Sequence, residues 1–466
     1  MSDTVVIEGG TVVTHDGQFR ADVVIANERI TALTTDATDI DADHRIDATG
    51  LLVLPGGIDV HTHFREPEEF TKEGFLAGGQ GAAAGGITTV IEMPQADPTT
   101  VTVEQFQAKR ARVNKNALVD MALWAGVVGP PLQDEVDLQD LAGTGAVAFK
   151  SFMASSSPSF PAVDTSTLYW AMSIIAETGL PYALHAEDNN LVQSGLKRLQ
   201  DAGRTDPMAH AESRPPLVEA VAVAEALYLA EVTGCWVHIC HCASADALRL
   251  IADARTRGVR VTVETCPQYL SLNTDDLLAL KGYGRCAPAL RSQDEVDHIW
   301  SYVLDETVDL ICSDHCGFTK EQKDAGEDDI FRAPMGLAGI QTLLPVFYDG
   351  AVRGHSMNLS QFVRQIATNP AQVFDLYPRK GTIAIGSDAD IVVFDPERSW
   401  VARGEDMAYK QKWTPFEGKT ITGRVIRTLR RGETVFDDSL EGEARLPALA
   451  GSGRFLPRGY GRAAVS

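Results

Sequence analysis

Between residues 52 and 315, short apolar runs alternate with helix-length segments. A short apolar run bounded by turn residues is typical of a buried strand, and a longer segment between two such runs suits a crossover helix. Eight runs in this rhythm predict an α/β fold, a closed parallel (β/α)8 TIM-like barrel. The expected strands are 52–63, 87–94, 118–127, 147–153, 181–188, 235–243, 259–270 and 308–315. The expected helices are 75–84, 103–111, 166–178, 217–233 and 244–256, followed by 336–349 and 360–374.

Both ends of the chain have a β-rich pattern instead. Strand-forming residues broken by turns occupy 5–14 and 22–33, and runs of the same style return at 385–395 and 421–432. The simplest interpretation is a small β-sandwich formed by both chain ends, with the barrel inserted between them. A tail rich in Gly and Arg follows, which predicts either an arm or disorder. The expected boundaries are 1–54 and 380–445 for the sandwich, 55–379 for the barrel and 446–466 for the C-terminal arm.

The composition narrows the choice of partners and compartment. The 466 residues are 44% hydrophobic and 23% charged, which is ordinary for a globular protein. A formal net charge of −23 argues against binding to nucleic acid or to an anionic membrane, because both need basic patches. No apolar run reaches about 18 residues and the first residues lack a signal-peptide pattern, so neither a membrane span nor a signal peptide is expected. Seven cysteines in a chain of this length favour reduced thiols in the cytoplasm.

Chemically active side chains recur where the expected strands end. His61 and His63 are two apart on the first strand, so both rings point the same way. Any one such residue is more often structural, but several of them at the mouth of one barrel predict an active site there. The residues at these strand ends are His61, His63, Lys150, His185, His241 and Asp314.

The sixth strand contains a second histidine and two cysteines. Because strand side chains alternate, His238 is expected to face the outer helices, away from His241, and the thiols of Cys240 and Cys242 to point away as well. His315 should likewise point away from Asp314. A thiolate zinc site is the alternative interpretation, but Cys-x-Cys within a strand does not bring four sulfur atoms together. Its ligands would come from Cys235, Cys240, Cys242, Cys312 and Cys316.

Seven motifs, taken in order, resemble those of one enzyme group, the cyclic amidohydrolases that include dihydroorotases, allantoinases and hydantoinases. Each motif is modest alone, but their order and spacing are specific, and the resemblance runs from about residue 4 to residue 437. The motifs are PGGIDVHTH at 55–63, AAAGGITTV at 82–90, FKSFM at 149–153, HAE at 185–187, ETCPQYL at 264–270, SDH at 313–315 and KGTIAIGSDAD at 380–390.

The resemblance implies a centre of two divalent metal ions, usually zinc, at the barrel mouth. In that group, residues matching His61, His63 and Asp314 bind one ion, and residues matching His185 and His241 bind the other. Histidine and carboxylate ligands suit several divalent metals, so the metal is not fixed by the sequence. Such enzymes are commonly homo-oligomers, dimers or tetramers.

The resemblance also implies a carboxylated lysine. Lys150, after its amine reacts with carbon dioxide, would bridge the two ions, because a carbamate is an anionic oxygen donor whereas an ammonium cannot bind a cation. A metal-bound hydroxide would then attack the ring carbonyl, which a metal ion polarises. Asp314 would take the proton and pass it to the leaving nitrogen.

The choice of cyclic amide rests on fewer residues. Arg65 resembles the arginine that holds the substrate carboxylate in dihydroorotases, and Gln95 is a second expected substrate-binding residue. Two positions depart from dihydroorotases: Glu68 replaces an expected glycine, and Gln95 an expected asparagine. The run YKQKWTPFEG at 409–418 is similar to allantoinases and L-hydantoinases, and 154–160 lacks the tyrosine of D-hydantoinases.

We therefore expect an allantoinase-type enzyme that opens a small-molecule cyclic ureide. Dihydroorotase or L-hydantoinase-like activity is the alternative. A catalytically inactive assembly partner is the non-enzyme alternative, and the complete set of metal-site residues argues against it.

Overall fold

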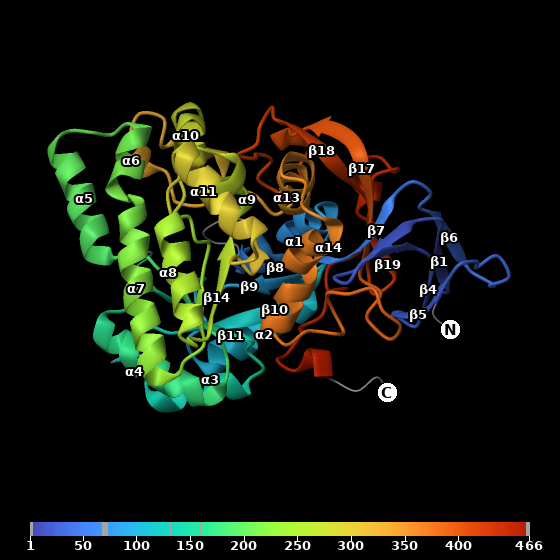
Figure 1. Cartoon of the computed structure of the whole chain (residues 1–466), viewed down its shortest axis with the longest axis horizontal. Coiled ribbons are helices and arrows are strands. Elements are labelled where there is room, and N and C mark those ends of the chain that lie inside the picture. The colour runs from blue at the N-terminus through green and yellow to red at the C-terminus, as the bar shows by residue number, and fades with distance from the viewer. Residues whose placement is uncertain (1–2, 68–72, 131, 156, 158–159, 463–466) are drawn as a thin grey trace.

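The computed structural model of the chain describes residues 3–67, 73–130, 132–155, 157 and 160–462. Its largest sheet is curled and has nine strands in the order β15-β14-β13-β12-β11-β10-β9-β8-β16 (Figure 1). Every pairing in it is parallel, and β16 pairs with β8, so the sheet closes on itself as the predicted barrel. The strands are β8 (Gly57–His63), β9 (Ile87–Glu92), β10 (Asp120–Gly126), β11 (Ala148–Phe152), β12 (Tyr182–His185), β13 (Val237–Ile239), β14 (Val261–Thr265), β15 (Leu310–Ile311) and β16 (His315–Cys316).

The eighth strand of the barrel is split into two short strands, β15 and β16, so the sheet has nine strands in total. The first half, β15, pairs with β14, and the second half, β16, pairs with β8. Asp59 of β8 holds the break, because its carboxylate accepts hydrogen bonds from the backbone N–H and the hydroxyl of Ser313. Asp314 follows in the left-handed region with φ of +50°. The break therefore turns Asp314 toward the barrel mouth instead of leaving it in a regular strand.

Helices cover the outside of the barrel, and the five predicted between strands are present. These five are α1 (Gly74–Ala84), α2 (Val103–Asn116), α4 (Thr165–Thr178), α7 (Pro216–Thr233) and α8 (Ala245–Thr256). Those that the apolar pattern did not predict are α3 (Glu135–Gly143), α5 (Asn189–Asp201), α6 (Pro207–Ser213), α10 (Thr274–Leu280), α11 (Gln293–Leu304) and α12 (Lys320–Asp324). In α1, a Cβ atom at Gly78 would meet the Phe64 ring at 2.4 Å, so the glycine lets this helix pack beside the end of β8.

Several predicted boundaries are wrong. The first barrel strand, expected over 52–63, is divided: β7 (Leu52–Pro55) pairs with strands of both chain ends, and only β8 belongs to the barrel. The strand expected to reach residue 270 ends at Thr265, and α9 (Pro267–Ser271) follows, because proline at the first helical position starts a helix and cannot extend a sheet ladder. The helix expected from residue 336 begins only at α13 (Leu343–Tyr348). Gly336 has φ of +142°, a conformation outside the helical region. The last predicted helix is found as α14 (Leu359–Val363) and α15 (Asn369–Val373), joined by a π-helical turn.

Both chain ends build the β-sandwich beside the barrel, where blue and red segments lie together in Figure 1. A four-stranded sheet has the order β5-β4-β1-β6, and a six-stranded sheet has the order β19-β18-β17-β7-β2-β3. Their facing apolar side chains, such as Ile7, Ile25, Val53 and Leu429, form one core. The exact domain boundaries remain a prediction. The strands are β1 (Val5–Glu8), β2 (Thr11–Val13), β3 (Gln18–Arg20), β4 (Asp22–Ala26), β5 (Arg29–Thr34), β6 (His44–Asp47), β7 (Leu52–Pro55), β17 (Ile391–Val401), β18 (Thr420–Arg430) and β19 (Glu433–Asp437).

The described part of the C-terminal tail, up to residue 462, packs against the base of the barrel. The Met121 N–H donates to the carbonyl oxygen of Arg454 at 2.9 Å, and the Leu456 N–H donates to that of Met121 at 2.9 Å. The N–H groups of Gly451 and Gly453 both reach the carbonyl of Ala117 at 2.9 Å. These bonds support an ordered arm, and residues 463–466 lie outside the described part of the chain.

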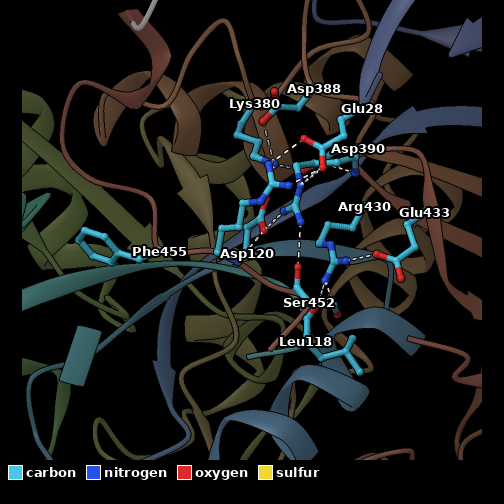
Figure 2. Close-up of polar contacts among 12 residues, drawn as sticks. Glu28, Leu118, Asp120, Lys380, Asp388, Asp390, Arg430, Glu433, Ser452 and Phe455 are labelled. Carbon is cyan, nitrogen blue, oxygen red and sulfur yellow. Dashed lines mark hydrogen bonds and ion pairs between the residues drawn. The ribbon is translucent and has the colours of Figure 1, made fainter. Parts of the chain in front are cut away.

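A network of buried charges joins this arm to the barrel and the sandwich (Figure 2). The Lys380 ammonium lies 2.7 Å from Asp120, 2.7 Å from Asp390 and 3.1 Å from Asp388. Arg431 also bonds to Asp120, and the backbone N–H of Arg454 donates to the same carboxylate at 3.0 Å. Asp120 begins β10, so this cluster (the base network) lies at the opposite end of the barrel from the predicted active site.

All seven cysteines are buried free thiols. Across the described ranges, no helix has the length and apolar character that crossing a membrane requires.

Candidate metal centre

His61, His63 and Asp314 meet at the mouth of the barrel. The Nε2 atoms of His61 and His63 lie 3.3 Å and 3.4 Å from Oδ1 of Asp314. Nδ1 of His61 bonds to Oε1 of Glu264 at 2.5 Å, which fixes the ring so that Nε2 faces the other two residues. Ligand atoms held tetrahedrally at about 2.0–2.1 Å from zinc are separated by about 3.3 Å. The spacing of these three residues therefore fits one metal ion, and they form a His/His/Asp group able to hold one.

His185 and His241 form a second pair beside the first group. Nδ1 of His185 lies 3.1 Å from Nε2 of His241, and Nε2 of His185 bonds to Glu187 at 2.8 Å. The His61 and His241 rings are 5.1 Å apart, so the two groups are adjacent. His241 follows the end of β13 and has φ of +34°. This left-handed turn directs its ring into the site.

Lys150 of β11 lies buried between these groups. Its Nζ atom is 2.9 Å from Sγ of Cys240 and 5.0 Å from the centre of the Phe152 ring. Among the described residues, Lys150 has no carboxylate partner within ion-pair distance. A buried ammonium without an anion is strongly unfavourable. Conversion to a carbamate would remove that positive charge, so the surroundings of Lys150 fit the predicted modification.

Two predictions about the sixth strand are wrong. His238 does not face the outer helices: its Nε2 atom bonds to Glu264 at 3.1 Å, and its ring lies inside the barrel near Trp124 and Phe374. Cys240 points toward Lys150, not away from the site. The cause is that β13 ends at Ile239, so strand alternation cannot be extended to His241.

His315, in contrast, points away from the two groups of candidate metal ligands, as expected. Its Nε2 atom bonds to Glu73 at 2.9 Å, and its Nδ1 atom accepts the N–H groups of Gly339 and Ile340.

Burial keeps the histidines neutral, the form that binds metals. Burial lowers the pKa of His61 to about 4. It also lowers the pKa of His185, and it holds the pKa values of His63 and His241 well below the ordinary value for histidine. Burial also raises the pKa of Asp314 to about 8, against the opposing effect of Lys150. Nδ1 of His63 and Nδ1 of His241 are buried with no hydrogen-bond partner in the described ranges. These polar groups are poorly compensated by the protein itself, as expected for a centre that binds cations.

A cavity of about 300 Å³ opens above these residues and is the space available to a substrate. Arg65 and Gln95 line it together, with Nη2 of Arg65 donating to Oε1 of Gln95 at 3.1 Å. Glu92, at the end of β9, holds the backbone at Arg65 in place, because its carboxylate accepts a hydrogen bond from the Arg65 N–H at 2.9 Å. Both predicted substrate-binding residues therefore lie in the cavity wall, whereas Glu68 is outside the described residues.

The sequence pattern did not identify four other polar residues around the site. Glu187 and Glu264 lie in motifs quoted above, and each bonds to a histidine of the site, so those motifs were the available signal. Arg214 and Arg285 line the cavity but come from loops without a recognisable pattern.

Comparisons with known proteins agree with this geometry. A model of the amidohydrolase family matches residues 52–435. An allantoinase from Rubrobacter xylanophilus is 40% identical over 93% of this chain and 94% of its own length. An L-hydantoinase from Paenarthrobacter aurescens is 33% identical over 97% of this chain and 98% of its own length. The solved structure of L-hydantoinase (dihydropyrimidinase) from Arthrobacter aurescens superimposes with a TM-score of 0.93 at 32% identity, covering 98% of this chain and 100% of that one.

Proposed function

The chain belongs to the amidohydrolase family, and on that premise we propose that it opens a cyclic ureide of the allantoin type by hydrolysing a ring carbon–nitrogen bond. The observation that carries the proposal is the convergence of chemically matched groups on the floor of one cavity. The likeness to allantoinases over most of the chain favours a ureide among the cyclic amides. The converging residues are His61, His63, Lys150, His185, His241 and Asp314.

We assign these residues to two metal ions. His61, His63 and Asp314 would hold one ion, and His185 and His241 the other, with the Lys150 carbamate between them. Zinc suits this donor set, although other divalent ions do as well. When bound, such ions polarise a carbonyl group and lower the pKa of a water molecule to about 7.

The protein side chains then move protons and hold the ligands in place. Asp314 lies within 3.4 Å of two histidines and borders the cavity, so its carboxylate can take a proton from water and return it to the leaving ring nitrogen. Glu264 and Glu187 hold His61 and His185 by their second nitrogen atoms. Cys240 lies against Nζ of Lys150 and restricts where that side chain can move.

Assembly and location are part of the proposal. On α7, the apolar side chains of Leu217, Val221, Tyr228 and Val232 are exposed along one face of the helix. A second copy of the chain would bury this face, which supports a homo-oligomer, a dimer or a tetramer. The free thiols support a reducing compartment such as the cytoplasm. Light scattering of the purified protein would give the number of subunits.

The function is tested by metal analysis together with a panel of substrates. We expect near-stoichiometric divalent metal, loss of activity on chelation, and ring opening of allantoin in preference to hydantoins, dihydropyrimidines and dihydroorotate. Purification without metal and with no turnover would favour an inactive assembly partner.

Arg65 keeps dihydroorotate as the alternative substrate, because a guanidinium suits a carboxylate. Arg65→Leu should lower kcat/KM for dihydroorotate by about 10- to 150-fold, since a charge-assisted hydrogen bond is lost. The loss for allantoin, which is neutral, should be much smaller. If the wild-type protein opens dihydroorotate well and Arg65→Leu does not, the allantoinase assignment is wrong.

A further inference from the structure

Arg285 lines the active-site cavity. It precedes Cys286 in the connection that follows α10, and its backbone carbonyl accepts the N–H of Gly336 at 3.0 Å. Its Nη1 atom donates to the carbonyl oxygens of Phe331 and Ala333. These bonds fix one side of the guanidinium against the loop 331–336, part of which also lines the cavity.

The other nitrogen atoms of this guanidinium lack partners within the described part of the chain. Nε is buried without a hydrogen bond, and Nη2 donates none. No carboxylate of those residues forms an ion pair with Arg285. Burial, followed by the neighbouring charge of Arg214, lowers the pKa of Arg285 to about 10. The free protein therefore holds a half-buried cation whose positive charge is not neutralised by a nearby acid.

Arg214, on the same cavity, is a useful contrast. It is buried, and its Nη1 atom bonds to Glu187, which is itself buried. Its charge is thus already compensated by the protein. Of the two arginines, only Arg285 has a positive charge that no carboxylate of the described residues balances.

The cavity as a whole is rich in cations although the chain is acidic. Three arginines line it, the four histidines there are kept neutral by burial, and Asp314 is the one carboxylate among the lining residues. The chain as a whole has a formal net charge of −23. A ligand that fits this lining carries electron-rich oxygen atoms beyond the reacting carbonyl group.

We propose that Arg285 binds an oxygen acceptor on the substituent of the substrate ring, such as the carbonyl of a ureido group, and so determines which cyclic ureides are hydrolysed. The inference rests on the proposed function and deepens it. Arg65 and Gln95 contact each other, and Arg285 adds a separate donor for the part of the substrate outside the ring. A guanidinium held by backbone carbonyls is already oriented, so less rotamer entropy is lost when it binds the substituent.

Allantoin and unsubstituted hydantoin provide the test, because they share a ring and differ in the ureido group. Arg285→Met should lower kcat/KM for allantoin by about 10- to 150-fold, through KM more than through kcat. For hydantoin the value should stay within about threefold, because no substituent is present to lose its donor. If hydantoin is bound but not opened, its inhibition constant against allantoin replaces kcat/KM.

Two further variants separate substrate binding from a structural role. Arg285→Lys keeps the positive charge and should recover part of the allantoin activity. Arg332→Met is the matched control: its side chain is 74% exposed on the same loop and pairs with Asp329, so neither substrate should be affected. The melting temperature of each variant reports on folding.

Three outcomes would overturn the inference. An equal loss for both substrates in Arg285→Met would mean that Arg285 acts only by holding the loop 331–336. No loss for allantoin would mean that another group binds the ureido carbonyl. A wild-type protein that opens neither ring but retains metal would refute the proposed function, and the role of Arg285 with it.

Discussion

Two buried polar clusters lie at opposite ends of the same barrel, and they differ in how their charges are balanced. In the base network, Lys380 is surrounded by Asp120, Asp388 and Asp390 (Figure 2). These acids raise the pKa of Lys380 although burial opposes the shift, and Lys380 with Arg431 lowers the pKa of Asp120. Opposite charges there favour each other's charged form, although burial, with the neighbouring Asp120 and Asp388, still raises the pKa of Asp390.

At the mouth of the barrel the shifts run the other way. Burial lowers the pKa of His61, His63, His185 and His241, and raises that of Asp314 to about 8. Burial is as complete at the mouth as at the base, so it cannot be what separates the two clusters. The difference lies in whether the opposite charges outweigh burial: Glu264 and Glu187 bond to His61 and His185, but burial still lowers the pKa of both histidines. A cluster that is left uncompensated marks a place where a ligand contributes binding energy, whereas a compensated one holds the fold together.

The largest effect is expected from Lys150→Ala. If Lys150 bridges two ions as its carbamate, its removal should abolish near-stoichiometric metal binding and reduce turnover to background. Short carboxylic acids added to the variant should restore some of both by occupying the vacated space. Metal content and allantoin turnover, each measured with and without acetate, test this prediction. A fully active alanine variant would rule out the bridging role.

A smaller effect is expected from Asp314→Asn, because this variant should keep the metal centre. Asp314→Asn preserves the shape of the side chain but removes its ability to accept a proton. We expect most of the metal to be retained and kcat to fall by about 10²–10⁴-fold, the range for general acid–base catalysis. Steady-state kinetics beside metal analysis separates the two roles. A rate near that of the wild type would assign the proton transfer to another residue.

The same contrast explains what could be predicted from the sequence. The mouth residues lie at or just after the ends of apolar strands, and in a parallel barrel those ends all meet at one mouth. The base network has no such periodicity: Lys380, Asp388 and Asp390 lie in one quoted motif, but Asp120 is 260 positions from Lys380 and meets it only because the sandwich packs against the barrel. Its formation depends on tertiary packing, which no local pattern encodes.

The errors inside the site have a local cause. Alternation predicted His238 correctly as buried, but on the wrong side, because the strand ends at Ile239. Arg285 was not predicted because it lies in a loop, where neither helix nor strand periodicity fixes the direction of a side chain. Left-handed conformations at Arg65, His241 and Asp314 are likewise invisible to periodicity, and all three residues border the cavity.

A third prediction tests the base network as a purely structural cluster. Lys380→Met leaves Asp120, Asp388 and Asp390 without their shared cation, and breaking a buried ion pair costs about 3–5 kcal/mol. The free energy of unfolding, measured with a chemical denaturant, should fall by that amount, while metal content and kcat of the folded protein stay near wild type. Lys197→Met is the control, because its pair with Asp201 is exposed and should contribute less than about 1 kcal/mol. If Lys380→Met loses metal but keeps its stability, the base network cannot be a purely structural cluster.

The smallest effect is expected at the outer edge of the base network. Arg454 of the C-terminal arm pairs with Glu28, and the two side chains are 53% and 42% exposed. The arm itself is held by backbone groups, because the Arg454 N–H donates to Asp120 and its carbonyl accepts from Met121. Arg454→Ala keeps those bonds, so it should lower the free energy of unfolding by only about 0.2–1 kcal/mol.

Salt distinguishes this exposed pair from the buried charges. At about 1 M salt the Debye length falls to about 3 Å, so the effect of Arg454→Ala should vanish. The effect of Lys380→Met should largely persist, because the solvent does not reach its partners. Denaturant unfolding of both variants at low and high salt measures the two effects together. If Arg454→Ala costs as much as Lys380→Met, or keeps its effect in high salt, then the arm is held by the side-chain ion pair and the base network extends to the surface.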